Sequence, residues 1–211
     1  MKKIVFLVWL TAFFAQIAWA QEKIEAPVWN VGDQWVFTQG TDMKVIRVDE
    51  NGYSVKIANQ TIVLDKSTLN RTFILLGKKR EVYKERQRRL FDFPLVIGKS
   101  WKDKYSAPLR PEDVWLDVGP MAVSSLGDET IVYEYYRVLG REEVEVEAGR
   151  FKAIKIEYKK EWDLSQGKLK EGRAWYWYSP EVKNMVKAQY GKSQMWMREN
   201  DWELISFNFI R

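Results

Sequence analysis

Short segments in which apolar and polar residues alternate recur along most of this chain, and they constrain its fold more than any other feature. In FKAIKIEY (residues 151–158), the isoleucines and the tyrosine would share one face, while the lysine and glutamate between them face water. Such segments follow one another at spacings of about 8–12 residues, with turn residues between them, which is typical of sandwiches and barrels. The pattern predicts an all-β fold, a curved antiparallel sheet or open half-barrel, with room for one short helix.

The alternation predicts strands at residues 34–38, 43–48, 53–58, 61–65, 72–76, 143–147, 151–158, 173–178, 182–190, 194–198 and 202–210. Asn51-Gly52 and Ala148-Gly149 mark tight turns, and the first pair is a strong hairpin signal. Residues 78–90 are predicted to form a long polar strand, with a charged helix as the alternative. Residues 102–127 contain three prolines and little pattern, so a loop-rich excursion is expected there.

Residues 1–20 predict a secretory signal peptide. Two lysines precede an apolar stretch at residues 4–14, and small residues at positions 18 and 20 predict a cut between Ala20 and Gln21. The stretch is shorter than the roughly 20 apolar residues of a membrane span. We therefore expect a periplasmic or secreted protein that does not span the membrane after cleavage, with residues 21–211 as a single β-rich domain. Nucleic acid is not an expected partner there.

The chain has no Cys and no His, which excludes disulfides, thiolate zinc sites and His-dependent catalytic triads. With 34 Lys+Arg against 29 Asp+Glu, its net charge is +5, or +3 once the two lysines of the signal peptide are removed. Adjacent carboxylates such as Glu142 and Glu143 lack a motif that would mark them as catalytic. We therefore expect a non-enzymatic protein with no cofactor and no metal.

Aromatic residues are abundant, and nine of the eleven tryptophans lie after residue 20. In residues 175–178 (WYWY), both faces of one predicted strand carry aromatic rings. Such rings can fill a β core that lacks disulfides, or they can line a site for an apolar ligand or a glycan. In the ligand hypothesis, the concavity of the half-barrel is lined by six residues, namely Trp175, Tyr176, Trp177 and Tyr178 along its wall, and Trp35 and Trp101 at its ends.

Residues 78–89 carry seven positive and two negative side chains. Such a cationic segment can protect a sheet edge from pairing with another edge, or it can attract phospholipid head groups and anionic polymers. The second interpretation assigns Arg86, Arg88 and Arg89 to an anionic head group at the rim of the concavity.

Four segments resemble a group of uncharacterised bacterial exported proteins. They are VGDQWVF (31–37), FPLVIGKSW (93–101), EVEAGRFKA (145–153) and WYWYSPEV (175–182), the last followed by MVK. The resemblance covers most of the chain after residue 20. It implies a non-enzymatic envelope protein with a half-barrel like that of the periplasmic lipoprotein carriers LolA and LolB, and it assigns no binding residue.

Together these features predict a periplasmic protein that binds a hydrophobic or amphiphilic ligand, such as a lipid or a lipoprotein. Two alternatives stay open. A protein–protein interaction module of the cell envelope would use an exposed sheet edge or aromatic patch. A glycan-binding module, or a glycan-cleaving enzyme, would expose tryptophan rings in a polar groove.

Overall fold

The computed structural model describes residues 23–38, 40–58, 60–76, 79–82, 89–108, 129–164, 168–191 and 201–210. Within these ranges the chain forms twelve strands: β1 (Gln34–Phe37), β2 (Thr41–Asp49), β3 (Gly52–Ile57), β4 (Gln60–Leu64), β5 (Arg71–Leu76), β6 (Lys79–Val82), β7 (Ser100–Pro108), β8 (Glu129–Val146), β9 (Gly149–Leu164), β10 (Lys168–Ser179), β11 (Asn184–Tyr190) and β12 (Trp202–Asn208). No helix occurs in the described ranges, so neither the short helix allowed by the sequence nor a membrane-crossing helix is found there.

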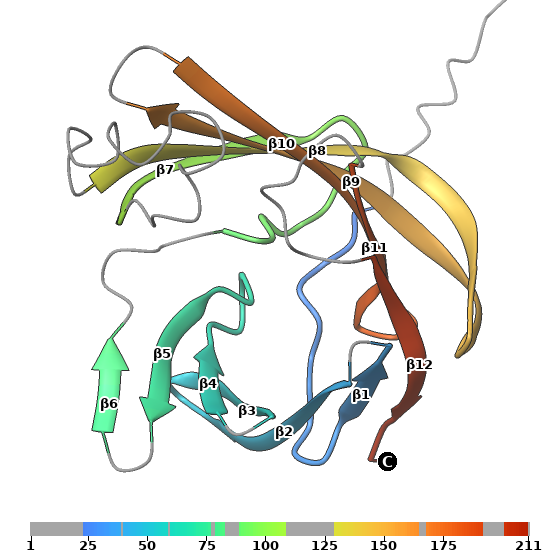
Figure 1. The fold of residues 1–211 in the computed structure, drawn as a ribbon. Coiled ribbons are helices and arrows are strands. Elements are labelled where there is room, and N and C mark those ends of the chain that lie inside the picture. The colour runs from blue at the N-terminus through green and yellow to red at the C-terminus, as the bar shows by residue number, and fades with distance from the viewer. Residues whose placement is uncertain are drawn as a thin grey trace, which may run out of the picture.

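All twelve strands belong to one antiparallel sheet with the order β6-β5-β4-β3-β2-β1-β12-β11-β10-β9-β8-β7. The sheet curls so that β1–β6 face the long strands β7–β10 across the molecule (Figure 1). Its two edge strands, β6 and β7, lie on the same side but do not pair with each other. The all-β fold and the open, curved antiparallel sheet that the sequence predicts are confirmed.

Tight turns join neighbouring strands where glycine supplies a left-handed backbone. Gly52 has a φ of +131° and ends the β2–β3 turn, where a Cβ would lie 2.1 Å from the carbonyl oxygen of Leu64. Gly149 has a φ of +133° at the β8–β9 turn. Both predicted hairpins are therefore confirmed, because only glycine adopts such φ values without strain.

The predicted strands differ from the observed ones chiefly in three places. Residues 102–108 belong to β7, although the prolines nearby favoured a loop. β8 begins at Glu129, well before the predicted strand at 143–147. Its first half pairs with β7, and residues 131–146 pair with β9. Within the predicted polar strand at 78–90, β6 covers four residues and the chain at Arg89 is not a strand. The predicted signal peptide, residues 83–88, most of the 102–127 excursion and the strand at 194–198 lie outside the described residues.

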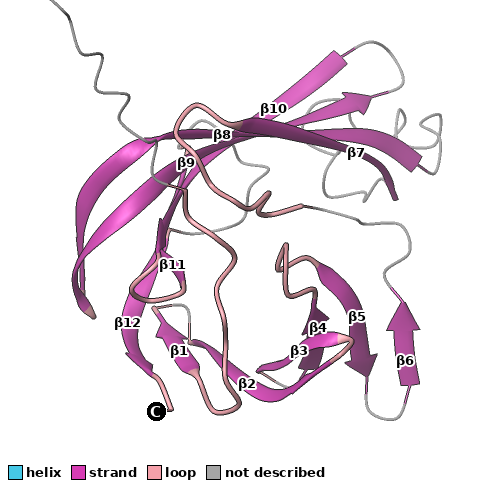
Figure 2. Cartoon of the chain, turned by 180° about the vertical axis from the view of Figure 1, so that it is seen from behind, coloured by secondary structure: helices cyan, strands magenta, loops and turns pink. Residues whose placement is uncertain are grey.

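The face of β7–β11 that carries Trp101, Tyr136, Tyr158 and Tyr176 packs into the core, and we call it the inner face. Two loop segments, residues 23–33 and 89–99, cross the space between the two halves of the sheet (Figures 1 and 2). They are joined by a two-residue bridge between Ile24 and Leu95. Their buried side chains, Ile24, Trp29, Phe91 and Leu95, all belong to the core cluster. The concave side of the sheet is therefore packed with the protein's own chain.

Asp33, from the VGDQW segment, joins two parts of the backbone at one end of this core by hydrogen bonds. It is fully buried and accepts hydrogen bonds from the backbone N–H groups of Asn30 (2.9 Å) and Ile210 (3.2 Å). The Lys183 ammonium lies 3.9 Å from its carboxylate. A buried carboxylate needs such partners, so this part of the motif serves the fold.

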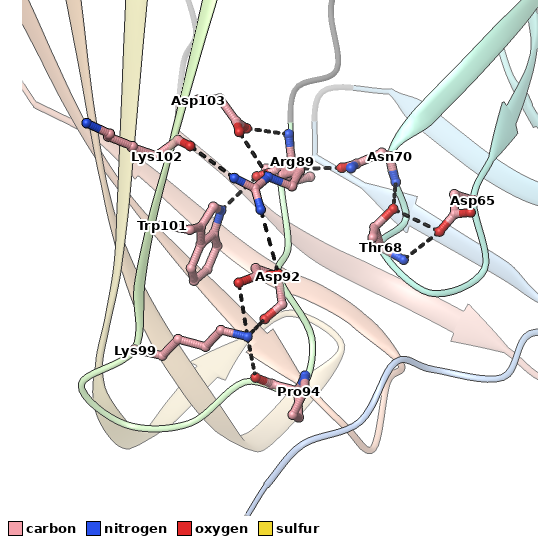
Figure 3. Close-up of polar contacts among 11 residues, drawn as sticks. Asp65, Thr68, Asn70, Arg89, Asp92, Pro94, Lys99, Trp101, Lys102 and Asp103 are labelled. Carbon is pink, nitrogen blue, oxygen red and sulfur yellow. Dashed lines mark hydrogen bonds and ion pairs between the residues drawn. The ribbon is translucent and has the colours of Figure 1, made fainter.

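The β4–β5 connection is closed by Asp65. Its Oδ1 accepts hydrogen bonds from the hydroxyl and the backbone N–H of both Ser67 and Thr68, at 2.6–2.9 Å. Burial alone would raise the pKa of the Asp65 carboxyl, but these hydrogen bonds outweigh it and hold the pKa below its ordinary value. The Thr68 hydroxyl also accepts from the backbone N–H of Asn70, whose side-chain oxygen accepts from Leu90 N–H (Figure 3).

Candidate functional site

An open groove of about 630 Å³ lies on the outer face of β7–β10, opposite the core. Its volume falls within the range of small-molecule sites, roughly 300–1,000 Å³. Four cationic and two anionic side chains contribute to it. The lining residues are Ser100, Trp101, Lys102, Tyr135, Tyr136, Arg137, Glu157, Lys159, Glu161 and Arg173.

Strand register gathers these side chains from distant parts of the sequence. Lys102, Tyr135, Lys159 and Arg173 are successive cross-strand partners on β7, β8, β9 and β10. Because side chains two residues apart in a strand share a face, the neighbouring row of Ser100, Arg137 and Glu157 points the same way. Eight of the ten lining residues therefore lie on the outer face, in these two rows and at Glu161, and the inner-face residues Trp101 and Tyr136 also contribute to the lining.

Ion pairs join part of the groove into a network. The Lys159 ammonium lies 2.6 Å from Glu161 and 3.1 Å from Glu171. The Arg173 guanidinium lies 2.7 Å from Glu171 and 4.0 Å from Glu157. Across strands, alternating charges of this kind stabilise one another and fix the side chains in place.

The pKa values of Lys159, Arg173, Tyr135 and Glu171 all lie further from neutral pH than the ordinary values of these groups. Hydrogen bonding to Glu161 and then Glu171 raises the pKa of Lys159, and hydrogen bonding to Glu171 raises that of Arg173. The hydrogen bond from Arg173 lowers the pKa of Glu171. Burial, then the hydrogen bond to Glu161, raises the pKa of the Tyr135 phenol.

Each shift keeps its group in the protonation state it already has at neutral pH. General acid–base catalysis favours a group whose pKa lies near the working pH, and these shifts move in the opposite direction. In the described part of the chain, no cluster of acidic residues could hold a metal ion. The network therefore keeps Lys159 and Arg173 positively charged and Glu171 negatively charged at neutral pH.

Two cations of the groove stand apart from the network. Lys102 and Arg137 are exposed, and among the described residues neither forms an ion pair within 4.0 Å. They occupy adjacent strands in neighbouring rows, so their side chains can reach a common point. The groove therefore offers two uncompensated positive charges next to each other.

The six aromatic residues of the ligand hypothesis do not share one surface. Because side chains alternate along β10, Tyr176 and Tyr178 point to the inner face, whereas Trp175 and Trp177 point to the outer face with Glu157 and Lys155. Trp177 is nevertheless part of the core cluster, and Trp175 packs against it. The expectation that all four line one concavity is therefore wrong. Tyr176, Trp177 and Tyr178 are buried, and Trp175 is half-buried.

The other predicted aromatic contacts are also embedded in the protein. Trp35 is completely buried, and its indole N–H donates to the carbonyl of Val182 at 2.8 Å. Trp101 is buried and donates to the carbonyl of Arg89 at 2.8 Å. Trp177 lies beneath the Lys155 ammonium, 4.8 Å from its ring centroid, and donates to Glu142. Nothing in these placements tests ligand contact, which stays a prediction for these residues.

Of the three arginines predicted at the rim, Arg86 and Arg88 lie outside the described residues. Arg89 is 41% exposed, but its guanidinium is bonded within the protein, as Figure 3 shows. Its Nε donates to Asp103 at 3.0 Å and its Nη2 donates to the Lys102 carbonyl at 3.1 Å. Arg89 therefore fastens the 89–99 segment to β7, and its contact with a head group stays a prediction.

The groove residues were not predicted from the sequence. Lys102 lies in the segment predicted as a loop, Arg137 lies in a stretch with no predicted strand, and Lys159 directly follows the predicted strand at 151–158. Their common signal is charge at every second position, which also marks an ordinary wet face. Only the register of four strands shows that they line one groove.

A second missed feature lies on the inner face. Glu134 is fully buried, and its carboxylate accepts hydrogen bonds from the hydroxyls of Tyr105 (3.0 Å), Tyr136 (3.0 Å) and Tyr158 (2.7 Å). The rings of Trp101 and Tyr136 stack at 5.1 Å next to it. Phenol donors satisfy a carboxylate that burial would otherwise destabilise, so this cluster belongs to the core.

No protein-family model and no curated protein matches the sequence. Solved structures with loose similarity to the chain include the following three. A "putative lipoprotein" from Parabacteroides distasonis ATCC 8503 has a TM-score of 0.44 at 13% identity, covering 89% of this chain and 100% of its own. A "putative exported protein" with a YmcC-like fold from Bacteroides fragilis NCTC 9343 has a TM-score of 0.39 at 13% identity, with the same coverage. The hypothetical lipoprotein YmcC from Escherichia coli K12 has a TM-score of 0.43 at 10% identity, covering 89% of this chain and 90% of its own.

The descriptions of the three proteins name exported proteins and lipoproteins. None names LolA or LolB, and the resemblance to those carriers stays a prediction.

Proposed function

We propose that this protein is a non-catalytic binding protein of the cell envelope, and that its ligand is an amphiphile with an anionic phosphate head group. The phosphate binds in the β7–β10 groove, and the signal peptide predicted at residues 1–20 directs export. The proposal keeps the amphiphilic ligand that the sequence predicts, but moves its head group from the concave side to the outer face.

The observation that supports it is the pair of exposed cations, Lys102 and Arg137, in a groove of ligand size. An Arg guanidinium binds phosphate oxygens through paired N–H donors, and a Lys ammonium adds a point charge. Lys159 and Arg173 already have carboxylate partners, so their charge is less available to a ligand.

An apolar neighbour favours an amphiphile over a bare anion. Leu139 lies two residues after Arg137, at a register shift of β8 just outside the groove lining, and is 40% exposed. An acyl chain leaving the head group can therefore lie against an aliphatic side chain. The concave side offers less room, because residues 23–33 and 89–99 fill it with buried side chains.

The test is a calorimetric titration with dihexanoylphosphatidylglycerol, a short-chain lipid, below its micelle concentration. The head group alone, glycerol 3-phosphate, forms the second arm. We expect the Lys102→Gln/Arg137→Gln variant to bind the lipid at least about tenfold more weakly, a change of about 1.4 kcal/mol. Tighter binding of the lipid than of glycerol 3-phosphate supports an amphiphile, whereas equal binding assigns the groove to free phosphate esters.

The matched control is Lys44→Gln/Lys56→Gln. These two exposed lysines are direct cross-strand partners on β2 and β3, far from the groove, and their loss removes the same charge. The control should bind like the wild type. An equal loss in both double variants would mean general attraction by net charge, and absent binding in the wild type would refute the proposal.

A further inference from the structure

Among the three carboxylates in or beside the groove, Glu157 has the fewest partners. Glu161 receives the Lys159 ammonium at 2.6 Å and also the Tyr135 hydroxyl, and Glu171 receives both Lys159 and Arg173. Within the described residues, Glu157 has one ionic contact, a 4.0 Å approach of Arg173. Its side chain is 31% exposed, so a ligand can reach it.

Glu157 is the direct cross-strand partner of Arg137. Adjacent strands are separated by about 4.8 Å, so the two side chains start one strand spacing apart on the same face. Although their charges are opposite, no ion pair joins them in the structure, and Arg137 remains exposed. The groove therefore presents a cationic site at Lys102 and Arg137, and an anionic site one strand away.

A two-carbon linker between a phosphate and an amine separates the two charges by a distance similar to one strand spacing. We propose that the ligand is zwitterionic, a phosphate ester that carries a primary ammonium group, as in a phosphoethanolamine head group. Its phosphate binds Lys102 and Arg137, and its ammonium donates hydrogen bonds to Glu157. This inference rests on the proposed function above.

The chemistry of Glu157 predicts which amine is preferred. A primary ammonium has three N–H donors, and hydrogen bonds between charged groups are the stronger ones. A trimethylated amine has no donor and cannot make them. Two aromatic rings lie nearby. Tyr135 already faces the Lys159 ammonium at 6.0 Å, and Trp175, the half-buried cross-strand partner of Glu157, can attract either kind of ammonium, so the hydrogen bonds decide the preference. The groove should therefore favour phosphoethanolamine over phosphocholine.

The experiment compares three short-chain lipids in calorimetric titrations of the full chain: dihexanoylphosphatidylethanolamine, dihexanoylphosphatidylcholine and dihexanoylphosphatidylglycerol. We expect the wild type to bind the ethanolamine lipid about tenfold more tightly than the choline lipid. Glu157→Gln should abolish that preference and leave binding of the glycerol lipid equal or tighter. Glu147→Gln, at an exposed position after β8, is the matched control and should retain the preference.

The outcomes separate this inference from the proposed function. If the wild type binds the ethanolamine and choline lipids equally, and Lys102→Gln/Arg137→Gln still weakens binding of the glycerol lipid, the zwitterion inference is wrong and the phosphate site stands. If Glu157→Gln weakens all three lipids alike while its thermal midpoint is unchanged, Glu157 acts by positioning Arg137, which also overturns the inference. If no lipid binds the wild type, both proposals fail.

Discussion

Replacing Trp35 by phenylalanine tests whether the tryptophans near the VGDQW segment serve the core. The buried indole of Trp35 donates to the Val182 carbonyl at 2.8 Å, and its ring centroid lies 4.9 Å from that of Trp29. Phenylalanine lacks the donor and leaves the carbonyl unpaired, a loss of about 1–3 kcal/mol. The smaller ring also leaves a cavity, and full truncation of a buried Trp costs about 3–5 kcal/mol. We therefore expect Trp35→Phe to destabilise the protein by about 2–4 kcal/mol.

The assay is urea unfolding followed by circular dichroism, with the midpoint compared at constant slope. Trp175→Phe, at a half-buried position on the outer face, is the control and should cost about 0.5 kcal/mol or less. Trp29 donates to the carbonyl of Lys183, the residue after Val182, at 2.9 Å. The Trp29→Phe/Trp35→Phe double variant should therefore show a coupling of at least about 0.5 kcal/mol. Equal losses for Trp35→Phe and Trp175→Phe, with no coupling, would refute the reasoning.

Two further predictions concern turns. Gly32→Ala should destabilise the fold by about 1–3 kcal/mol, because Gly32 has a φ of +98° and a Cβ would lie 2.5 Å from Cγ1 of Ile210. A urea midpoint equal to that of the wild type would contradict this expectation. Asp65→Asn should cost about 1 kcal/mol at neutral pH, because an amide oxygen accepts the four hydrogen bonds from Ser67 and Thr68 more weakly than a carboxylate oxygen does. Since the folded-state pKa of Asp65 is lowered, its stabilisation is present above the unfolded pKa of about 3.9 and disappears as the pH falls through the folded value. Urea unfolding at pH 7 and at about pH 3 should therefore show a difference that shrinks in acid, and a constant difference would count against the role of the charge.

Much of the sheet could be predicted from local pattern. In residues 151–158 the alternation alone identifies which side chains face the core, and Ile154, Ile156 and Tyr158 are indeed buried. Local pattern fails where both faces carry similar residues. The WYWY segment has rings at every position, so its sequence could not show that Trp177 lies on the outer face, beneath Lys155.

The candidate groove could not be predicted from local sequence pattern. Within their own segments, Lys102, Arg137 and Glu157 look like ordinary surface residues. They line one groove only because β7, β8 and β9 pair in the observed register. Register across β7, β8 and β9 is set by contacts between residues far apart in sequence, such as the stacked rings of Trp101 and Tyr136. A shift of one residue would move every one of these side chains to the other face.

The sequence by itself determined the all-β class, the hairpin turns and the exclusion of Cys- and His-dependent chemistry, because alternation, turn residues and composition act locally or over the whole chain. Tertiary structure alone decided that residues 23–33 and 89–99 fill the concave side, and that the uncompensated cations lie on the outer face. Those outcomes depend on which distant segments pack together, since burial and charge pairing are properties of three-dimensional neighbours.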